Sequence, residues 1–179
     1  MAHRLVVEFD ERVDALFDRL RGHPVADRVF YTASALGEFG LIWVVFALLR
    51  ALRGGRLNEK AACRAIVATG VESVLVNVVI KSFVRRRRPA NHVSHPLPLR
   101  QPLSSSFPSG HATAAFCGAT LLSDGDDPLT PLYAATALVV ATSRVYVRIH
   151  HASDVVAGMA VGRLLGMIGK RLAPLGVRD

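Results

Sequence analysis

Long apolar segments that carry almost no charge constrain the fold of this chain more than any other feature. Segments 101–123 and 128–143 contain no Lys, Arg, Asp or Glu, and segments 30–49 and 65–80 are each interrupted by one glutamate. A helix needs about 20 predominantly apolar residues to cross the hydrocarbon core of a bilayer, and these segments approach that length. The pattern predicts a polytopic bundle of membrane helices whose occasional polar residues face the interior.

The charge distribution supports this class and excludes a nucleic-acid-binding domain. The chain has 179 residues, enough for one domain, and its mean hydropathy is +0.32. Its net charge is +8, but the basic residues gather at the ends of the apolar segments. Cations in that position flank membrane helices or contact anionic head groups. We therefore expect the membrane, and not a nucleic acid, to be the partner of the basic residues.

Residues 1–24 are predicted to form an amphipathic helix that lies on the membrane surface or against the bundle. Leu5, Phe9, Val13 and Phe17 recur at helical spacing, while acids and arginines fill the opposite face. The rest of the chain predicts about five spanning helices within one all-α domain of residues 1–179. These spans are expected at about 29–49, 61–83, 108–122, 129–147 and 155–168.

The segment from Ser143 to Asp154 concentrates ionisable side chains between two apolar segments. If His150 to Asp154 lies in a helix, both side chains share one face, and Asp154 can accept a hydrogen bond from one imidazole nitrogen. The other nitrogen would then be unprotonated and able to act as a nucleophile or base. An ordinary helical polar pair has the same spacing, so this motif alone leaves both interpretations open.

A basic cluster ends the predicted 61–83 span. On a helix, residues seven apart are only about 20° out of register, so Lys81 and Arg88 can face the same way. Arg86 and Arg87 would point elsewhere, and Pro89 would end the helix. A basic flank that anchors a helix end is the alternative interpretation.

The stretch that follows, 90–107, is rich in Pro and Ser and is predicted to be an ordered loop or lid. His92 and His95 lie within it, but they lack a third ligand, and we expect no metal there.

The tetrapeptide Pro108-Ser109-Gly110-His111 opens the next apolar segment. Ser109 and Gly110 suit the N-cap of a helix, so backbone N–H groups and the positive end of the helix dipole would face an anion. His111, in the first turn, is either an acid–base group or a capping residue.

These three sites are expected to meet on one face of the membrane. The helices after His111 and before Ser143 form a hairpin, which returns the chain to the side that it left. Cations and a helix N-terminus would then surround a small anion, for which phosphate is the commonest candidate. Two histidines provide a nucleophile and a proton donor, so phosphoryl transfer would need neither metal nor cofactor.

Three motifs together resemble the signature of the type 2 phosphatidic acid phosphatase superfamily. They are Lys81-x6-Arg88-Pro89, Pro108-Ser109-Gly110-His111 and Ser143-Arg144-x5-His150-x3-Asp154, and the resemblance covers about residues 60–170, the expected catalytic core. The resemblance implies that His150 attacks phosphorus, that Asp154 orients it, and that His111 protonates the leaving group and then activates water. It also implies that five residues hold the phosphate oxygens: Lys81, Arg88, Ser109, Gly110 and Arg144. His151 and Arg148 fall outside the motifs.

The expected function is that of an integral membrane lipid phosphate phosphatase without a metal. The leading substrate is a polyprenyl diphosphate of the undecaprenyl type, followed by phosphatidate and phosphatidylglycerol phosphate. A lipid phosphotransferase shares the first half-reaction and stays open as an alternative. A non-catalytic protein that binds anionic lipid through residues 85–88 is disfavoured, because lipid binding needs neither histidine.

The resemblance also favours the bacterial plasma membrane, with the active site on the extracytoplasmic side. Counted by loop, the basic residues favour the cytoplasmic side. The sequence leaves the oligomeric state open.

Overall fold

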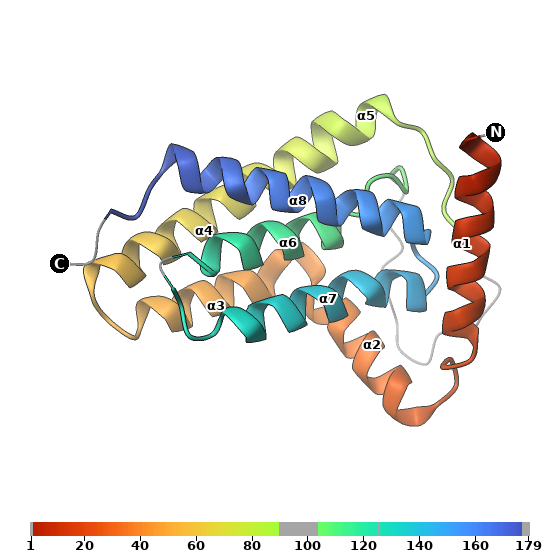
Figure 1. The fold of residues 1–179 in the computed structure, drawn as a ribbon, viewed down its shortest axis with the longest axis horizontal. Coiled ribbons are helices and arrows are strands. Elements are labelled where there is room, and N and C mark those ends of the chain that lie inside the picture. The colour runs from red at the N-terminus through yellow and green to blue at the C-terminus, as the bar shows by residue number, and fades with distance from the viewer. Residues whose placement is uncertain (1, 90–103, 125, 177–179) are drawn as a thin grey trace.

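The computed structural model describes residues 2–89, 104–124 and 126–176, and within these ranges helices are the only regular secondary structure (Figure 1). The predicted all-α fold is therefore confirmed. The 90–107 loop, with His92 and His95, lies largely outside the described residues. The helices are α1 (Ala2–Asp18), α2 (Pro24–Leu36), α3 (Leu41–Ala51), α4 (Arg56–Val74), α5 (Lys81–Phe83), α6 (Gly110–Leu122), α7 (Thr130–Tyr146) and α8 (Ala152–Leu172). A single 3-10 turn, η1 (Glu38–Gly40), joins α2 to α3, and a π-helical stretch, η2 (Leu75–Ile80), joins α4 to α5.

Helix α6 forms the centre of the bundle, with α3, α4, α7 and α8 packed around it. Nine of its 13 residues are buried, and most of them are small. Helix α8 approaches α6 closely because Gly158, Gly162 and Gly166 face it. A Cβ atom at Gly162 would lie 2.2 Å from the Thr113 carbonyl oxygen, so only glycine fits there. This close packing places the start of α8 beside the start of α6.

Among the residues that the structure describes, two helical segments are long and apolar enough to cross a membrane, Arg56–Phe83 and Ala152–Leu172. The expected span over 29–49 is instead two helices, α2 and α3, which meet at an angle of 62° and could together form one span. The break follows from the backbone between them, because Phe39 and Gly40 have positive φ angles of 53° and 68°. The predicted number of about five spans stays a prediction.

The basic cluster after α5 also differs from what the sequence predicts. The sequence predicts a helix up to Pro89, but α5 ends at Phe83 and the chain continues in an extended conformation. The Arg86 carbonyl accepts a hydrogen bond from the Ser106 N–H at 2.9 Å, and the Arg86 N–H donates to Ser105 Oγ at 3.1 Å. In this extended segment Arg86 pairs with Asp10 and Asp154, and Arg88 donates to the Ile149 carbonyl.

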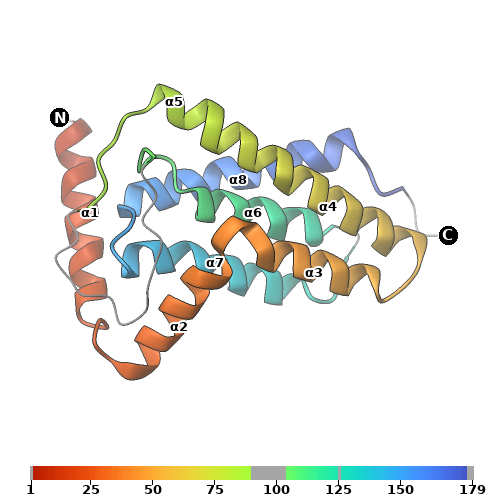
Figure 2. The ribbon, with the colours of Figure 1, turned by 180° about the vertical axis from the view of Figure 1, so that it is seen from behind.

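Helix α1 crosses the ends of α7 and α8 at one end of the bundle (Figures 1 and 2). Helix α1 thus packs against the bundle, whereas its predicted place on the membrane surface stays a prediction. Asp10 on this helix is buried and accepts hydrogen bonds from the backbone N–H and the hydroxyl of Ser153, at 2.8 and 2.9 Å. Helix α1 thereby holds the first turn of α8.

Candidate active site

A cavity of about 330 Å³ opens at the end of the bundle that α1 crosses, and residues of all three sequence motifs line it. The η2–α5 segment and the extended chain after it supply the first motif, the start of α6 supplies the second, and the end of α7 with the α7–α8 connection supplies the third. The motif residues that line the cavity are Lys81, Arg88, Gly110, His111, Arg144 and His150. The other two predicted residues, Ser109 and Asp154, are fully buried next to it.

His150 is 3% exposed and lies in the connection before α8. Its Nε2 atom is 3.1 Å from Arg88 Nη1, and its Nδ1 atom is 3.7 Å from Asp154 Oδ2. A guanidinium can only donate, so Nε2 accepts and carries no proton. The proton therefore resides on Nδ1, on the side of Asp154, and Nε2 is available as a nucleophile.

The His150–Asp154 pair forms for a different reason from the one that the sequence suggested. Helix α8 begins at Ala152, so His150 is not helical. The side chain of Asp154 instead folds back over the helix start, where Oδ2 accepts a hydrogen bond from the His151 backbone N–H at 3.0 Å. The Ser109 N–H donates to the Asp154 carbonyl at 3.1 Å, which ties α8 to the second motif.

Two residues that the sequence analysis missed complete the surroundings of Asp154. Ser106 Oγ donates to Asp154 Oδ2 at 2.6 Å and also lies 3.4 Å from His150 Nδ1. Arg86 Nη1 donates to Asp154 Oδ1 at 2.5 Å, and its Nη2 pairs with Asp10 at 2.6 Å. The expectation that Arg86 points away from the site is thus wrong. The extended backbone turns its side chain inward, and nothing within the run of four arginines marks that position.

Three cations from three different segments surround the space in front of His150. Lys81 Nζ donates to Asn77 Oδ1 at 2.8 Å, and Arg88 donates to the Ile149 carbonyl at 3.0 Å. Arg144 is fully buried and donates to Ser34 Oγ through Nη1, while its Nε has no hydrogen-bond partner among the described residues. Lys81 and Arg144 are buried and keep N–H groups without a partner among the described residues, so this space suits a multiply charged anion.

The N-terminus of α6 faces the same space. Ser109 is the N-cap residue, and its buried Oγ has no partner among the described residues. At Gly110, an added Cβ atom would lie 3.3 Å from Asn77 Oδ1 and 3.6 Å from Lys81 Nζ, so glycine keeps the cavity open. His111 Nε2 lies 3.3 Å from the Ser34 carbonyl, to which it can only donate. The N-cap role predicted for Ser109 is confirmed, although without a side-chain capping bond.

Burial lowers the pKa of His150 to about 4; the charges of Arg144 and Arg88 act in the same direction, and the hydrogen bond that His150 donates to Asp154 opposes them. In protein labelled at histidine, the NMR signal of His150 should therefore titrate near pH 4 instead of near 6.5. The signal is assigned by its loss in His150→Gln. In the unfolded chain the His150 imidazole takes up a proton near pH 6.5, whereas in the folded protein it does so only near pH 4. The folded state should therefore lose stability as pH falls between these two values. A His150 titration near 6.5 would contradict the predicted burial effect.

A sequence model of the PAP2 superfamily matches residues 61–175 of this chain. The decaprenylphosphoryl-5-phosphoribose phosphatase of Mycobacterium tuberculosis is 34% identical over 143 residues, which cover 76% of this chain and 76% of that protein. The undecaprenyl-diphosphatase of Sulfolobus acidocaldarius is 32% identical over 113 residues, which cover 62% of this chain and 55% of that protein.

The architecture is also similar to that of a solved membrane protein. The crystal structure of a transmembrane PAP2 type phosphatidylglycerolphosphate phosphatase from Bacillus subtilis matches with a TM-score of 0.69 and 25% identity. The match covers 94% of this chain and 86% of that chain, so the similarity extends beyond the three motifs to the whole bundle.

Proposed function

This chain belongs to the PAP2 superfamily, and from that premise we propose that it hydrolyses the terminal phosphate of a membrane lipid through a phosphohistidine at His150. Membership confirms the resemblance seen in the sequence. The relatives named as phosphatases make the chain a phosphatase, and its apolar helices together with the transmembrane neighbour make it an integral membrane protein. The observation that supports the proposed mechanism most directly is the unprotonated Nε2 of His150, which Arg88 and Asp154 hold in a cavity lined with cations.

In the first half-reaction, His150 Nε2 attacks phosphorus and the bond from phosphorus to the lipid oxygen breaks. His111 gives a proton to that oxygen as it leaves, so an alkoxide departs as an alcohol and a phosphate departs with one negative charge less. In the second half-reaction, His111 takes a proton from water, the water oxygen attacks phosphorus, and the P–N bond breaks. Inorganic phosphate leaves and both histidines return to their starting states.

The residues around the two histidines have separate roles in this proposal. Asp154 stabilises the positive charge that His150 gains, and it is itself fixed by Ser106 and Arg86. The three cations are Lys81, Arg88 and Arg144. Together with Ser109 and the Gly110 amide, they hold the phosphate oxygens as charge shifts in the transition state. Arg86 is a positioning residue, because it acts through Asp154.

For the lipid we propose a polyprenyl carrier. The sequence favours a polyprenyl diphosphate, and the names of two relatives describe phosphatases that act on polyprenyl compounds. Phosphatidate and phosphatidylglycerol phosphate are the next candidates, and water is the proposed phosphoryl acceptor. We place the protein in the bacterial plasma membrane with the cavity on its extracytoplasmic side.

Purified protein in detergent should release phosphate from polyprenyl phosphates or diphosphates, and EDTA should leave the rate within about twofold, because the proposed site uses histidines and cationic side chains alone. Phosphate release from each lipid phosphate of a panel is measured with and without EDTA. If no lipid phosphate is hydrolysed, or if chelation stops turnover and a divalent metal restores it, the proposal is wrong.

A further inference from the structure

Helix α1 keeps part of its apolar surface exposed although it packs against the bundle. Val13 and Phe17 turn inward and contact the core. The neighbouring positions around the helix are 43–62% exposed and form a second stripe, the outer stripe, which consists of Leu5, Phe9 and Leu16. At 3.6 residues per turn these three lie within about 40° of one another. Exposed apolar side chains that gather on one face mark a surface for a partner.

The rest of the helix surface is charged. Beyond the outer stripe lie Arg4, Glu8, Glu11 and Arg12. A face that packs on protein, an apolar stripe and a charged face therefore follow one another around α1. A helix at the surface of a bilayer has this arrangement, because it directs apolar side chains to the acyl chains and charged ones to water.

The position of α1 along the bundle matches the edge of a bilayer. Helix α8 has 21 residues and rises about 32 Å, which is close to the thickness of the hydrocarbon core. Its start at Ala152 therefore lies near one boundary of the core. Asp10 of α1 binds Ser153 in the first turn of α8, and α1 runs across the helix ends at this level (Figures 1 and 2).

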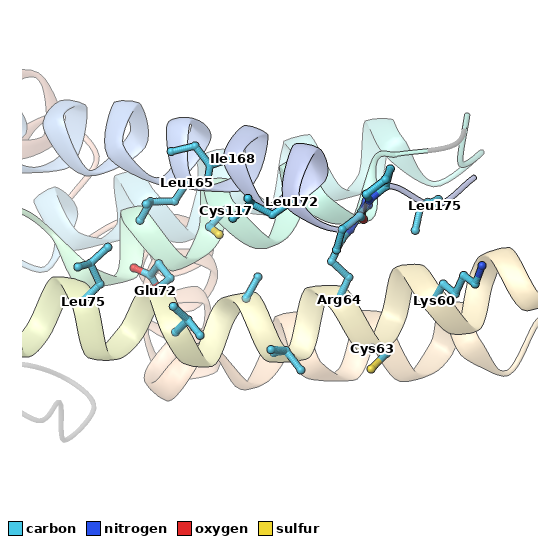
Figure 3. Close-up of a pocket in the computed structure, with 16 residues that line it drawn as sticks. Lys60, Cys63, Arg64, Glu72, Leu75, Cys117, Leu165, Ile168, Leu172 and Leu175 are labelled. Carbon is cyan, nitrogen blue, oxygen red and sulfur yellow. Dashed lines mark hydrogen bonds between the residues drawn. The ribbon is translucent and has the colours of Figure 1, made fainter. Parts of the chain in front are cut away.

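The flanks of the spans indicate where the acyl chains lie. An apolar groove of about 580 Å³ opens between α4 and α8, and Leu75, Leu165 and Ile168 are among the side chains that line it (Figure 3). Lys60 and Arg64 lie at its far end, near the start of α4 and away from α1. Cations flank the ends of membrane spans, so we place the bilayer core between the level of Lys60 and that of α1.

Asp10 links α1 to the active site. It is 7% exposed, and its carboxylate pairs with Arg86 at 2.6 Å and accepts two hydrogen bonds from Ser153. Arg86 donates in turn to Ser153 Oγ at 2.8 Å and to Asp154 Oδ1 at 2.5 Å. Two carboxylates thus fix the two ends of one guanidinium. Without Asp10, Arg86 is held at one end only and is free to turn away from Asp154.

A second set of contacts ties α1 to the connection that carries His150. Arg148 Nη2 donates to both carboxylate oxygens of Asp18, at 2.7 and 2.9 Å. Arg21, just after α1, donates to two backbone carbonyls at the end of α7, at 2.8 and 2.9 Å. A shift of α1 away from the bundle would therefore loosen the chain on the N-terminal side of His150 as well as the Asp154 carboxylate on the other side.

We propose that α1 binds the bilayer surface through the outer stripe and that Asp10 couples this contact to catalysis by holding Arg86 against Asp154. The partner of the stripe is a lipid surface, and Asp10 is a positioning residue. Helix α1 lies outside residues 61–175, which the family model matches, so the motifs assign it no role. The coupling rests on the proposed function, because it takes His150 to be the nucleophile.

Fluorescence quenching tests the contact with lipid. Phe9→Trp adds a tryptophan to the outer stripe, and Ala15→Trp adds one at an exposed position of the charged face. Each protein is reconstituted into phosphatidylcholine–phosphatidylglycerol vesicles whose acyl chains are brominated close to the head group. The signal of the unmodified protein, which contains Trp43 alone, is subtracted. The added tryptophan of Phe9→Trp should be quenched at least about threefold more strongly than that of Ala15→Trp.

The coupling is tested by kcat in unbrominated vesicles at saturating lipid phosphate. Asp10→Asn is nearly isosteric and should lower kcat by about tenfold with little change in KM, because no contact with the substrate is removed. The stripe variant, in which Leu5, Phe9 and Leu16 are all replaced by Gln, should lower kcat by about fivefold. Both changes act through Arg86, so the combined variant should lose at most about twofold more than Asp10→Asn alone.

Two further variants control for charge and folding. Arg4→Gln with Glu8→Gln removes an exposed ion pair from the charged face and should keep kcat within about twofold. Asp10→Glu keeps a carboxylate and should retain more activity than Asp10→Asn. Helix content and the melting temperature report on folding. If Asp10→Asn does not fold, Asp10→Glu takes its place in the combination, because the longer side chain also displaces Arg86.

Equal quenching of Phe9→Trp and Ala15→Trp would overturn the contact with lipid. If the stripe variant then also changed from dimer to monomer in detergent, a second copy of the chain would be the partner instead. Losses that multiply in the combined variant, or a loss in KM alone, would overturn the coupling. If the unmodified protein releases no phosphate from any lipid phosphate, the proposed function fails and the coupling with it, whereas the quenching still decides whether α1 contacts lipid.

Discussion

Replacement of His150 with alanine should lower kcat by at least about 10⁴-fold, because the account has no other group that can accept the phosphoryl group. The imidazole also closes the contact between Arg88 and Asp154, so removal of the ring leaves both charges without their common partner. Phosphate release by the purified variant in detergent, at saturating lipid phosphate, measures the effect.

The adjacent histidine offers a matched control. His151 lies outside the three motifs, and its backbone N–H, which any residue retains, is what contacts Asp154. It is the N-cap of α8, so His151→Asn keeps a good capping residue. This variant should stay within about threefold of the unmodified kcat, since its side chain has no part in the proposed steps. If kcat fell further in His151→Asn than in His150→Ala, the assignment of His150 as the nucleophile would be wrong.

Replacement of His111 with asparagine should lower kcat by about 10²- to 10⁴-fold, the usual contribution of a general acid or base. Asparagine can still donate to the Ser34 carbonyl, so the start of α6 is preserved. The loss should depend on the leaving group, because an activated nitrophenolate departs without a proton.

This dependence separates the two proposed steps of His111. With a nitrophenyl phosphate that carries an alkyl chain, the variant should release nitrophenol in a rapid burst and then turn over slowly, because water activation is still impaired. Burst kinetics are followed by absorbance in a stopped-flow instrument. An equal loss for natural and activated substrates, without a burst, would exclude His111 as the leaving-group acid.

The sequence predicted the ends of the central helices well because their signals are local. The Ser109 cap precedes α6 directly, and the turn before Thr130 separates two apolar segments, so α6 and α7 begin close to where they were expected. The motif residues also meet in one cavity as predicted. Hairpin geometry needs only helix lengths and a short turn, both of which are visible in the sequence.

Backbone conformation between helices could not be predicted in the same way. The break at Gly37–Gly40 depends on contact with α6, since a Cβ atom at Gly37 would lie 2.8 Å from the His111 ring. The end of α5 at Phe83 depends on hydrogen bonds between Arg86 and the segment at Ser105 and Ser106. These contacts join residues far apart in the chain, and a helical extrapolation from Lys81 to Pro89 cannot include them.

The same cause explains which site residues were missed. Arg86 and Ser106 reach Asp154 only because the extended segments that carry them pair with each other. The motifs identified the residues that we propose contact the phosphate, with Asp154, whereas Arg86 and Ser106, which hold Asp154, were found by geometry.

The central claim is that the phosphoryl group passes through His150, and trapping the intermediate tests it most directly. Enzyme in detergent is mixed with lipid phosphate labelled in its terminal phosphate, quenched in base within milliseconds, digested and mapped by mass spectrometry. The account predicts a phosphorylated imidazole on the peptide that contains His150, formed in the presence of EDTA and absent from His150→Ala. Label on His111 or His151, or turnover without any phosphorylated peptide, would contradict it.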